Sequence, residues 1–278
     1  MLNQILTPLI LVISFILIGF SFALPFTTIN PEFSTLWLGV SGLLYLCFRY
    51  YYRASIQYNL VKILSAFACV LFAAAFAVHL FDSPSFFITQ VQFSSNAEQV
   101  NIYYNFDKLI LGLIVLCSAP SLLQRSFKTK PLTLDRALKL LLVFSLSCLV
   151  IFLTAIALQL VALDVKTLPL SLLSIWAFKN LVLVCFGEEL LFRGFIQTEL
   201  AKWHPNSAWL ITAALFGLAH LPAGVAYAMV ATMAGLLYGW IYLKTDNILY
   251  PILAHFGFNC LHLVFFTYPY LIVSVNSG

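Results

Sequence analysis

The chain has 278 residues, of which 62% are hydrophobic and 9% are charged, and its mean hydropathy is +0.99. Soluble domains carry roughly 25% charged residues, so this composition excludes a soluble globular protein and predicts an integral membrane protein. The net charge of +4 is small and the basic residues are scattered through short loops, which gives no support to nucleic-acid binding. The six cysteines lack CxxC spacing, and we expect them to be buried packing residues.

Long apolar runs follow one another along the whole chain. A helix rises about 1.5 Å per residue, so about 20 apolar residues are needed to cross a hydrocarbon core of about 30 Å. We therefore predict an all-α, polytopic membrane protein with about eight to nine transmembrane helices. The first run has no basic region before it and no small-residue cleavage site, so we expect a retained span. The candidate spans are 6–24, 33–50, 61–80, 109–123, 138–163, 172–200, 207–224, 225–243 and 249–270.

Basic residues indicate how these spans are oriented. Lys and Arg concentrate beside the cytoplasmic loops of membrane proteins. In the nine-span arrangement most of the 14 basic residues fall on one side, and only Lys108 and Lys166 fall on the other. This distribution predicts a cytoplasmic amino terminus, and the short loops favour a multi-pass protein of a bacterial inner membrane. Residues 81–107 are then an extracytoplasmic loop, and we expect Lys179, inside the sixth span, to extend toward the headgroups.

A polar connection over residues 124–139, "QRSFKTKPLTLDRALK", divides the chain into two regions. Residues 1–130 form a four-span region of unknown role that has no charge inside its spans. Residues 131–278 contain all the intramembrane charges, so we expect the chemistry to belong to this second region. The connection includes Pro131, and it predicts that a helix begins at Thr133 or Asp135.

The stretch "GEELLFRG" places three ionisable groups within six residues of a predicted span. An ionisable residue costs about 2.5 to 3.5 kcal/mol at the centre of such a helix, so a functional site is the first hypothesis. Glu189 and Arg193 are spaced i, i+4 and are predicted to form an ion pair. Glu188 points about 100° away from Glu189 and is expected to remain available for another partner.

Two later spans bring further polar groups into apolar surroundings. His220 stands one turn after Phe216 in "LFGLAHLP", and His255 and Asn259 share one helix face in "ILAHFGFNC". Polar groups inside a bilayer need each other or water, so we expect the three helices to converge on one internal polar cavity. A carboxylate and a neutral imidazole there can deprotonate water, while imidazole and amide N–H groups can stabilise an oxyanion. These groups suit the attack of water on an amide.

The three motifs Glu188-Glu189-x-x-x-Arg193, Phe216-x-x-x-His220 and His255-x-x-x-Asn259 resemble, in this order, those of the CPBP family of intramembrane proteases. This family includes the CAAX prenyl proteases. The resemblance implies a helical endopeptidase that cleaves a membrane-associated protein or peptide within the lipid bilayer and needs no cofactor. By this resemblance Glu188 activates water with His220 as its partner, His255 and Asn259 stabilise the oxyanion, and Glu189 with Arg193 forms a supporting ion pair.

Two other classes of function remain open at this point. A zinc-dependent membrane hydrolase would take its ligands from Glu188, Glu189, His220 and His255, although the chain has no H-E-x-x-H motif. A non-catalytic membrane scaffold or immunity-type protein would use the same polar cluster for binding. The identity of the substrate, including whether it is prenylated, does not follow from the sequence.

Overall fold

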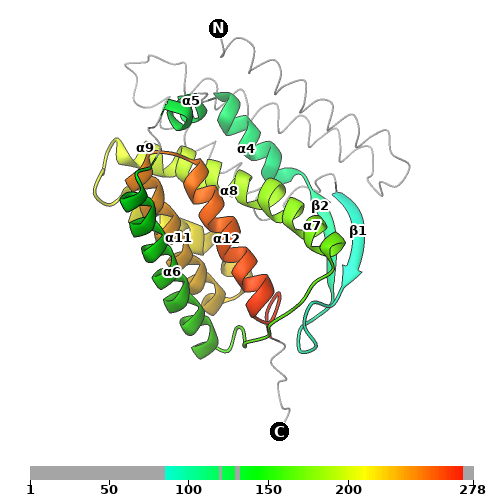
Figure 1. Cartoon of the computed structure of the whole chain (residues 1–278). Coiled ribbons are helices and arrows are strands. Elements are labelled where there is room, and N and C mark those ends of the chain that lie inside the picture. The colour runs from blue at the N-terminus through cyan, green and yellow to red at the C-terminus, as the bar shows by residue number, and fades with distance from the viewer. Residues whose placement is uncertain (1–84, 119–120, 129–131, 272–278) are drawn as a thin grey trace.

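A computed structural model describes residues 85–118, 121–128 and 132–271 of the chain (Figure 1). The predicted spans 6–24, 33–50 and 61–80 lie outside the described residues. The described part is mostly helical and has one β-hairpin. Its separate helices are α4 (Asp107–Ser118), α5 (Ser121–Lys128), α6 (Leu134–Ala157), α10 (Ala208–Ala219), α11 (Val225–Thr245) and α12 (Leu249–Phe265).

A continuous helix from Leu170 to Ala201 crosses the bundle formed by α6, α11 and α12 (Figure 1). The π-helical turn, in which hydrogen bonds run from residue i to i+5, is rare and occurs often at functional sites. Here two π-helical segments flank α8, the short segment that contains both glutamates. In order, the parts of the helix are α7 (Leu170–Phe178), η1 (Lys179–Cys185), α8 (Phe186–Glu189), η2 (Leu190–Gln197) and α9 (Thr198–Ala201).

Within the described residues, three helices are long and apolar enough to cross a membrane: Leu134–Ala157, Leu170–Ala201 and Val225–Thr245. Two shorter apolar helices accompany them, Ala208–Ala219 and Leu249–Phe265. These five helices begin within a few residues of the predicted spans. Three of them, α6, α10 and α12, end five or six residues earlier than predicted. The protein is a multi-pass integral membrane protein, and the total of eight to nine spans stays a prediction.

Helix α6 illustrates how the sequence sets these elements. Thr133 is its N-cap, and its side chain accepts a hydrogen bond from the backbone N–H of Arg136, as the sequence predicts. One face of α6 is buried and includes Ile151 and Phe152. The opposite face exposes a row of leucines, which is the arrangement expected of a helix that borders lipid. The exposed residues are Leu134, Leu138, Leu141, Leu142, Leu146, Leu149, Val150 and Leu153.

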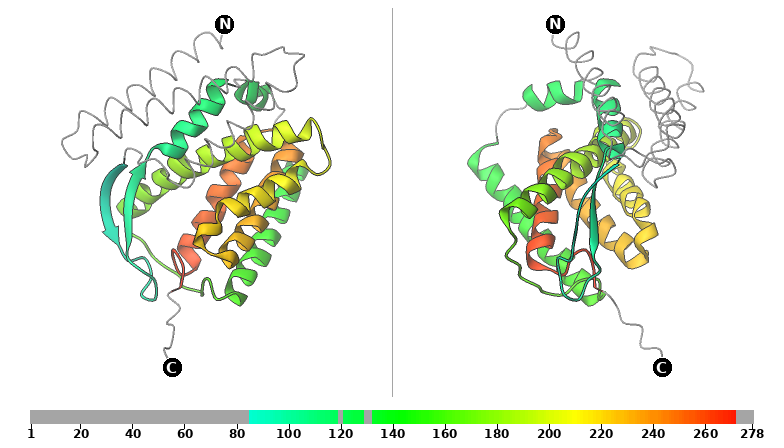
Figure 2. Two further views of the ribbon diagram at one scale, coloured as in Figure 1. Left: turned by 180° about the vertical axis from the view of Figure 1, so that it is seen from behind. Right: turned by 90° about the vertical axis from the view of Figure 1, so that its right-hand side faces the viewer.

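The β-hairpin is a departure from the all-α prediction. Strands β1 (Ser85–Val91) and β2 (Val100–Asn105) pair in antiparallel fashion within the segment that we predicted to be a loop. Both strands are rich in aromatic and β-branched residues, which favour extended structure. The hairpin lies beside α7, at the opposite end of the long helix from α9 (Figures 1 and 2). Its inner face, including Phe93 and Ile102, packs with Trp176 and Leu263.

Small residues allow α10 and α11 to approach closely. A Cβ atom added to Gly235 would lie 3.2 Å from the backbone of Ala213, and one added to Gly217 would lie 1.8 Å from the Thr232 hydroxyl. Close packing of this kind is expected of small residues at helix interfaces in membranes. It brings the backbone carbonyl groups of α11 within reach of the long helix.

Candidate active site

Glu189 lies at the centre of a buried network of charged groups. Its Oε1 atom accepts a hydrogen bond from Arg193 Nη1 at 2.9 Å, and it lies 2.9 Å from His255 Nδ1. Glu189 and Arg193 are both completely buried. The predicted i, i+4 ion pair is therefore present. The contact with His255, which comes from a different helix, places Nδ1 against the carboxylate and leaves Nε2 as the second ring nitrogen.

Arg193 also connects the long helix to its neighbours. Its Nη2 atom donates to the backbone oxygen of Gly235 at 2.9 Å. The guanidinium carbon lies 4.8 Å from the centre of the Phe216 ring and 5.4 Å from that of Tyr238, within the range of cation–π attraction. Three helices, the long helix, α10 and α11, thus meet around this side chain, which explains how one arginine can hold its charge inside the bundle.

Glu188 has a partner that the sequence analysis did not predict. Lys108 Nζ, at the start of α4, lies 2.6 Å from Glu188 Oε1. The other oxygen, Oε2, is buried and makes no hydrogen bond within the described residues. Glu188 thus has a partner other than Glu189 or Arg193, in agreement with the prediction that it stays available for one. This partner belongs to residues 1–130, the region in which we predicted no charge inside the spans.

Two glycines explain how α4 comes so close to the long helix. A Cβ atom added to Gly187 would lie 2.0 Å from the backbone oxygen of Lys108. A Cβ atom added to Gly112 would lie 2.8 Å from the Cα atom of Gly187. A larger residue at either position would force the two helices apart, so these glycines bring Lys108 to the carboxylate beside Gly187.

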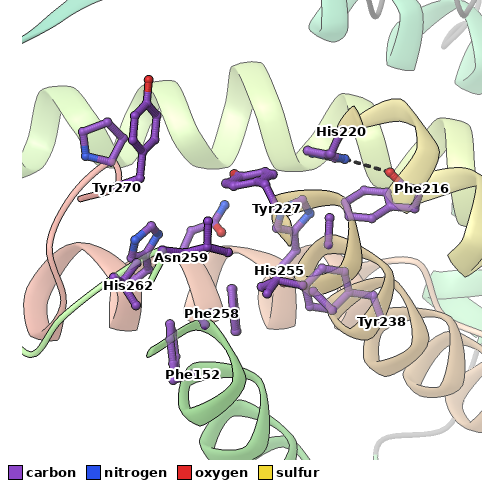
Figure 3. A pocket seen from close by; sticks show the side chains of 17 residues that line it. Phe152, Phe216, His220, Tyr227, Tyr238, His255, Phe258, Asn259, His262 and Tyr270 are labelled. Carbon is purple, nitrogen blue, oxygen red and sulfur yellow. Dashed lines mark hydrogen bonds between the residues drawn. The ribbon is translucent and has the colours of Figure 1, made fainter. Parts of the chain in front are cut away.

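His220 ends α10 and is half-buried. Its Nδ1 atom lies 2.8 Å from the backbone oxygen of Phe216, one turn earlier in the helix (Figure 3). A carbonyl oxygen only accepts hydrogen bonds, so Nδ1 must carry the proton in this contact. In the neutral imidazole, Nε2 is then an acceptor, which is the form able to hold a water molecule and receive its proton.

Asn259 lies one turn after His255 on α12. Its Nδ2 atom donates to Asn180 Oδ1 at 3.1 Å and is 3.7 Å from Cys185 Sγ, which donates to the same Asn180 oxygen at 3.3 Å. Asn180 and Cys185 belong to the π-helical segment η1 of the long helix. This network fixes the orientation of the Asn259 amide and explains why polar groups occur in an otherwise apolar turn.

The four residues predicted to carry the chemistry line one cavity of about 460 Å³. They are Glu188, His220, His255 and Asn259. An adjoining apolar cavity of about 80 Å³ shares all of them except Glu188 and is lined by Phe216, Phe258 and other aromatic residues (Figure 3). The convergence of three helices on one polar space agrees with the sequence prediction. Burial by the surrounding helices keeps these polar groups apart from lipid.

Other cavity-lining residues come from outside the three motifs. Lys179 lines the cavity, which contradicts the expectation that it extends toward the headgroups. In an ideal α-helix Lys179 and Glu188 would be two and a half turns apart and on opposite faces, but the π-helical segment between them changes this register. Tyr268, beyond the end of α12, accepts a hydrogen bond from Trp176 Nε1. Burial raises the pKa of Tyr268 to about 12, so its phenol stays neutral at cellular pH.

The zinc hypothesis requires metal ligands from Glu188, Glu189, His220 and His255. Within the described part of the chain, no three or more His, Cys, Asp or Glu side chains come together in a way that could hold a metal ion. The side chains that the zinc hypothesis needs are instead engaged with other groups. Glu188 is bonded to Lys108, and Glu189 to Arg193 and His255. A catalytic zinc site needs three protein ligands that converge on the metal, and in this arrangement both glutamates are bonded to other side chains instead.

Lys108, Asn180 and Tyr227 are among the residues of this cavity that the sequence did not indicate as site residues. Asn180 carried a usable signal, because an amide inside an apolar span needs a partner. Lys108 was visible as a charge at the start of a predicted span, but nothing local in the sequence indicates a contact 80 residues away.

These features define a class of protein: a helical membrane protein with a cavity that contains a buried glutamate, two histidines and an asparagine. Residues 170–261 match the family model described as Type II CAAX prenyl endopeptidase Rce1-like. The segment that carries the three motifs is therefore similar to the CAAX protease (CPBP) family, which confirms the resemblance predicted from the sequence.

A curated relative also matches part of the chain. It is the uncharacterized protein YpbD of Bacillus subtilis (strain 168), which is 38% identical over 78 residues. The matched stretch covers 27% of this chain, and the chain spans only 37% of the relative's length. No solved structure matches the chain.

Proposed function

We propose that this protein is an intramembrane endopeptidase that hydrolyses a peptide bond in a membrane-associated protein or peptide. The observation that supports this most strongly is the single cavity lined by Glu188, His220, His255 and Asn259. The match of residues 170–261 to a family of CAAX prenyl endopeptidases favours the same reaction class. The protein would act in a bacterial inner membrane with its amino terminus in the cytoplasm, as the distribution of Lys and Arg predicts.

In the proposed mechanism, Glu188 and His220 activate a water molecule. Oε2 of Glu188 makes no other hydrogen bond within the described residues, and the Nδ1 contact of His220 leaves its Nε2 as an acceptor. A water molecule held between these atoms would lose a proton to Glu188 as its oxygen attacks the carbonyl carbon of the substrate. The same carboxyl group would later return the proton to the leaving amine.

His255 and Asn259 would stabilise the negative charge that develops on the carbonyl oxygen, His255 as an imidazolium whose Nδ1–H binds Glu189 and whose Nε2–H is the second donor. Both line the cavity, and each is oriented by a further residue, His255 by Glu189 and Asn259 by Asn180. Donors that are oriented before the reaction need not reorganise during it, which lowers the barrier. Glu189 and Arg193 would support this arrangement without contacting the substrate. No cofactor enters this mechanism.

The proposed substrate is an unwound segment of a membrane-associated polypeptide. A helix cannot expose its backbone carbonyl groups to an attacking water, so the substrate must be extended where it is cut. The apolar cavity beside His255, with Phe216, Tyr238 and Phe258 in its wall, would accept an apolar side chain next to the cleaved bond.

The test compares the termini of membrane proteins in cells that carry either the wild type or the Glu188→Gln variant at matched, folded abundance. Glutamine keeps the shape of the side chain but cannot accept the proton, so we expect new termini only in wild-type cells. The purified proteins should reproduce the difference on the substrate identified in this way. Identical termini in both cells would contradict the proposal and would favour a binding protein. Activity that depends on bound zinc would favour the metal-dependent hydrolase.

A further inference from the structure

We infer that Lys108 is a positioning residue for Glu188, that it holds one oxygen of the carboxylate and that it leaves the other to the attacking water. This inference rests on the proposed function of Glu188 as the base. It also assigns a role in the reaction to a residue that lies outside the segment matching the protease family, since Lys108 precedes residue 170 by more than 60 positions.

The two oxygens of Glu188 have different surroundings. Lys108 Nζ lies 2.6 Å from Oε1, a distance typical of a short, charge-assisted hydrogen bond. Oε2 is buried and makes no hydrogen bond within the described residues. A carboxylate that is held at one oxygen has less freedom to rotate, so its second oxygen keeps a defined direction. Reactions of this kind depend strongly on such positioning of the base and the water.

Charge balance provides a second argument. An ionised carboxylate inside a membrane helix is costly unless a cation compensates it. Arg193, another cation near α8, donates instead to Glu189 and to the Gly235 carbonyl. Lys179, which lines the same cavity, forms no ion pair with Glu188 within the described residues. The ammonium group of Lys108 compensates the charge of Glu188. It thereby keeps the carboxylate in the ionised form that a base requires.

The position of Lys108 is enforced by its own surroundings. Its backbone N–H donates to the side chain of Asp107 at 2.8 Å, which helps to define the beginning of α4. Its backbone oxygen is in contact with the long helix at Gly187, where no Cβ would fit. Strand β2 ends at Asn105, so the hairpin leads directly into this turn. The lysine is therefore held at both its backbone and its side chain.

The proton balance of the proposed reaction is complete without proton transfer from Lys108. A water O–H bond breaks, its proton moves to Oε2 of Glu188, and the water oxygen bonds to the carbonyl carbon. When the C–N bond breaks, the amine takes this proton from Glu188. Lys108 keeps its own proton throughout, and its charge orients Glu188 at each stage.

The experiment measures kcat and KM of the full-length protein in lipid, with a substrate that the wild type cuts and Glu188→Gln does not. A hydrogen bond to a charged group contributes about 1.5 to 3 kcal/mol, so Lys108→Met should lower kcat roughly 10- to 100-fold with little change in KM. Lys108→Arg, which keeps the charge, should retain most of kcat. Lys202→Met is the matched control, because it removes a lysine from an exposed ion pair with Glu199 just beyond the end of the long helix.

Chemical rescue separates a positioning role from a structural one. Lys108→Ala removes the side chain and leaves space beside Glu188. Added ethylammonium should restore part of kcat to Lys108→Ala, and it should have no effect on Glu188→Gln. Thermal unfolding of each variant in detergent shows whether the fold is retained.

Each outcome separates the inference from the proposed function. If Lys108→Met keeps the wild-type kcat while Glu188→Gln is inactive, the inference is wrong and the endopeptidase proposal stands. If Lys108→Ala and Lys108→Arg both lose activity in proportion to lost thermal stability, and ethylammonium restores nothing, Lys108 is only structural. If wild type and Glu188→Gln behave identically, the proposed function fails and this inference fails with it.

Discussion

The two faces of the helix Leu170–Ala201 carry adjacent glutamates in opposite surroundings. Glu189 is completely buried, and one of its oxygens is shared between Arg193 and His255. Glu188 borders a cavity of about 460 Å³ and is bonded to Lys108 at Oε1, while Oε2 of both glutamates has no hydrogen-bond partner within the described residues. The residue type is the same and the positions are consecutive, so the difference comes entirely from what packs against each face.

This difference separates structure from chemistry within one turn of helix. The face with Glu189 has no space for water or substrate, and its charges bind three helices together. The face with Glu188 has space, a cation from α4 and an imidazole from α10. We expect substitutions on the first face to lower stability and those on the second to lower activity, and each prediction below tests this division.

The largest effect on stability is expected from Arg193→Met. This change leaves Glu189 as an uncompensated charge in a completely buried position and removes the bond to the Gly235 carbonyl. Breaking a buried pair in this way costs about 3 to 5 kcal/mol. The free energy of unfolding in detergent should fall by this amount. Arg125→Met is the matched control, because its exposed pair with Asp246 contributes at most about 1 kcal/mol. Equal losses in the two variants would contradict the structural role of the Glu189 face.

The next effect is expected on the cavity face, from Asn259→Ala. Removal of one donor to an oxyanion costs roughly 10²- to 10³-fold in kcat, so the variant should be folded and nearly inactive. Asn180→Ala, which removes only the residue that orients Asn259, should lose about 10-fold. Kinetics and thermal unfolding of both variants test this order. An Asn259→Ala variant that keeps its kcat but unfolds at a lower temperature would show that Asn259 only packs the helices.

Local features of this site were predictable from the sequence. The pairing of Glu189 with Arg193 follows from their i, i+4 spacing on a helix, and the N-cap at Thr133 follows from its position before an apolar run. The helical class and the approximate bounds of α6, α11 and the long helix follow from the length of their apolar runs. Each of these features depends on residues close together in the chain.

Features that depend on tertiary packing were not predictable in the same way. The contact of Lys108 with Glu188 joins residues 80 positions apart, and that of His255 with Glu189 joins residues 66 positions apart. Lys179 was misplaced because the sequence does not reveal the π-helical turn that changes its direction. The hairpin was missed because a polar segment between apolar spans is usually a loop. Its aromatic and β-branched residues were the signal that favoured strands.

A smaller effect is expected where the cavity face meets α4. Gly187→Ala would place a Cβ atom 2.0 Å from the Lys108 backbone oxygen, so the two helices must separate. Overpacking of this kind costs about 1 to 3 kcal/mol, and the separation should also lower kcat by moving Lys108 away from Glu188. Gly257→Ala is the matched control, because its added Cβ atom would meet only Phe144 at 3.5 Å. It should stabilise α12 by up to about 1 kcal/mol. A Gly187→Ala variant with unchanged stability and kcat would contradict the close approach of α4.

The smallest effect is expected at the hairpin, which forms part of the cavity wall. The Ser94 side-chain oxygen accepts a hydrogen bond from the backbone N–H of Tyr268 at 2.9 Å, and this contact links the hairpin to the chain beyond α12. Ser94→Ala should therefore lower the free energy of unfolding by about 1 kcal/mol and speed amide exchange at Tyr268. Ser95→Ala, at an exposed position in the same loop, should change neither measurement.

The pH dependence of the stability of Ser94→Ala tests a second interaction of the Ser94 hydroxyl, the one with Asp164. The Ser94 hydroxyl, followed by Lys166, holds the pKa of the Asp164 carboxyl below its usual range. A lowered pKa means that ionised Asp164 adds stability above its unfolded pKa of about 3.9, and that this stability is lost as the pH falls through the lower folded value. The difference in the free energy of unfolding between wild type and Ser94→Ala should thus be larger at pH 7 than below a pH of about 3. A difference that is constant over this range would show that Ser94 acts through Tyr268 alone. In that case Asp164 takes no part in holding the hairpin at the cavity.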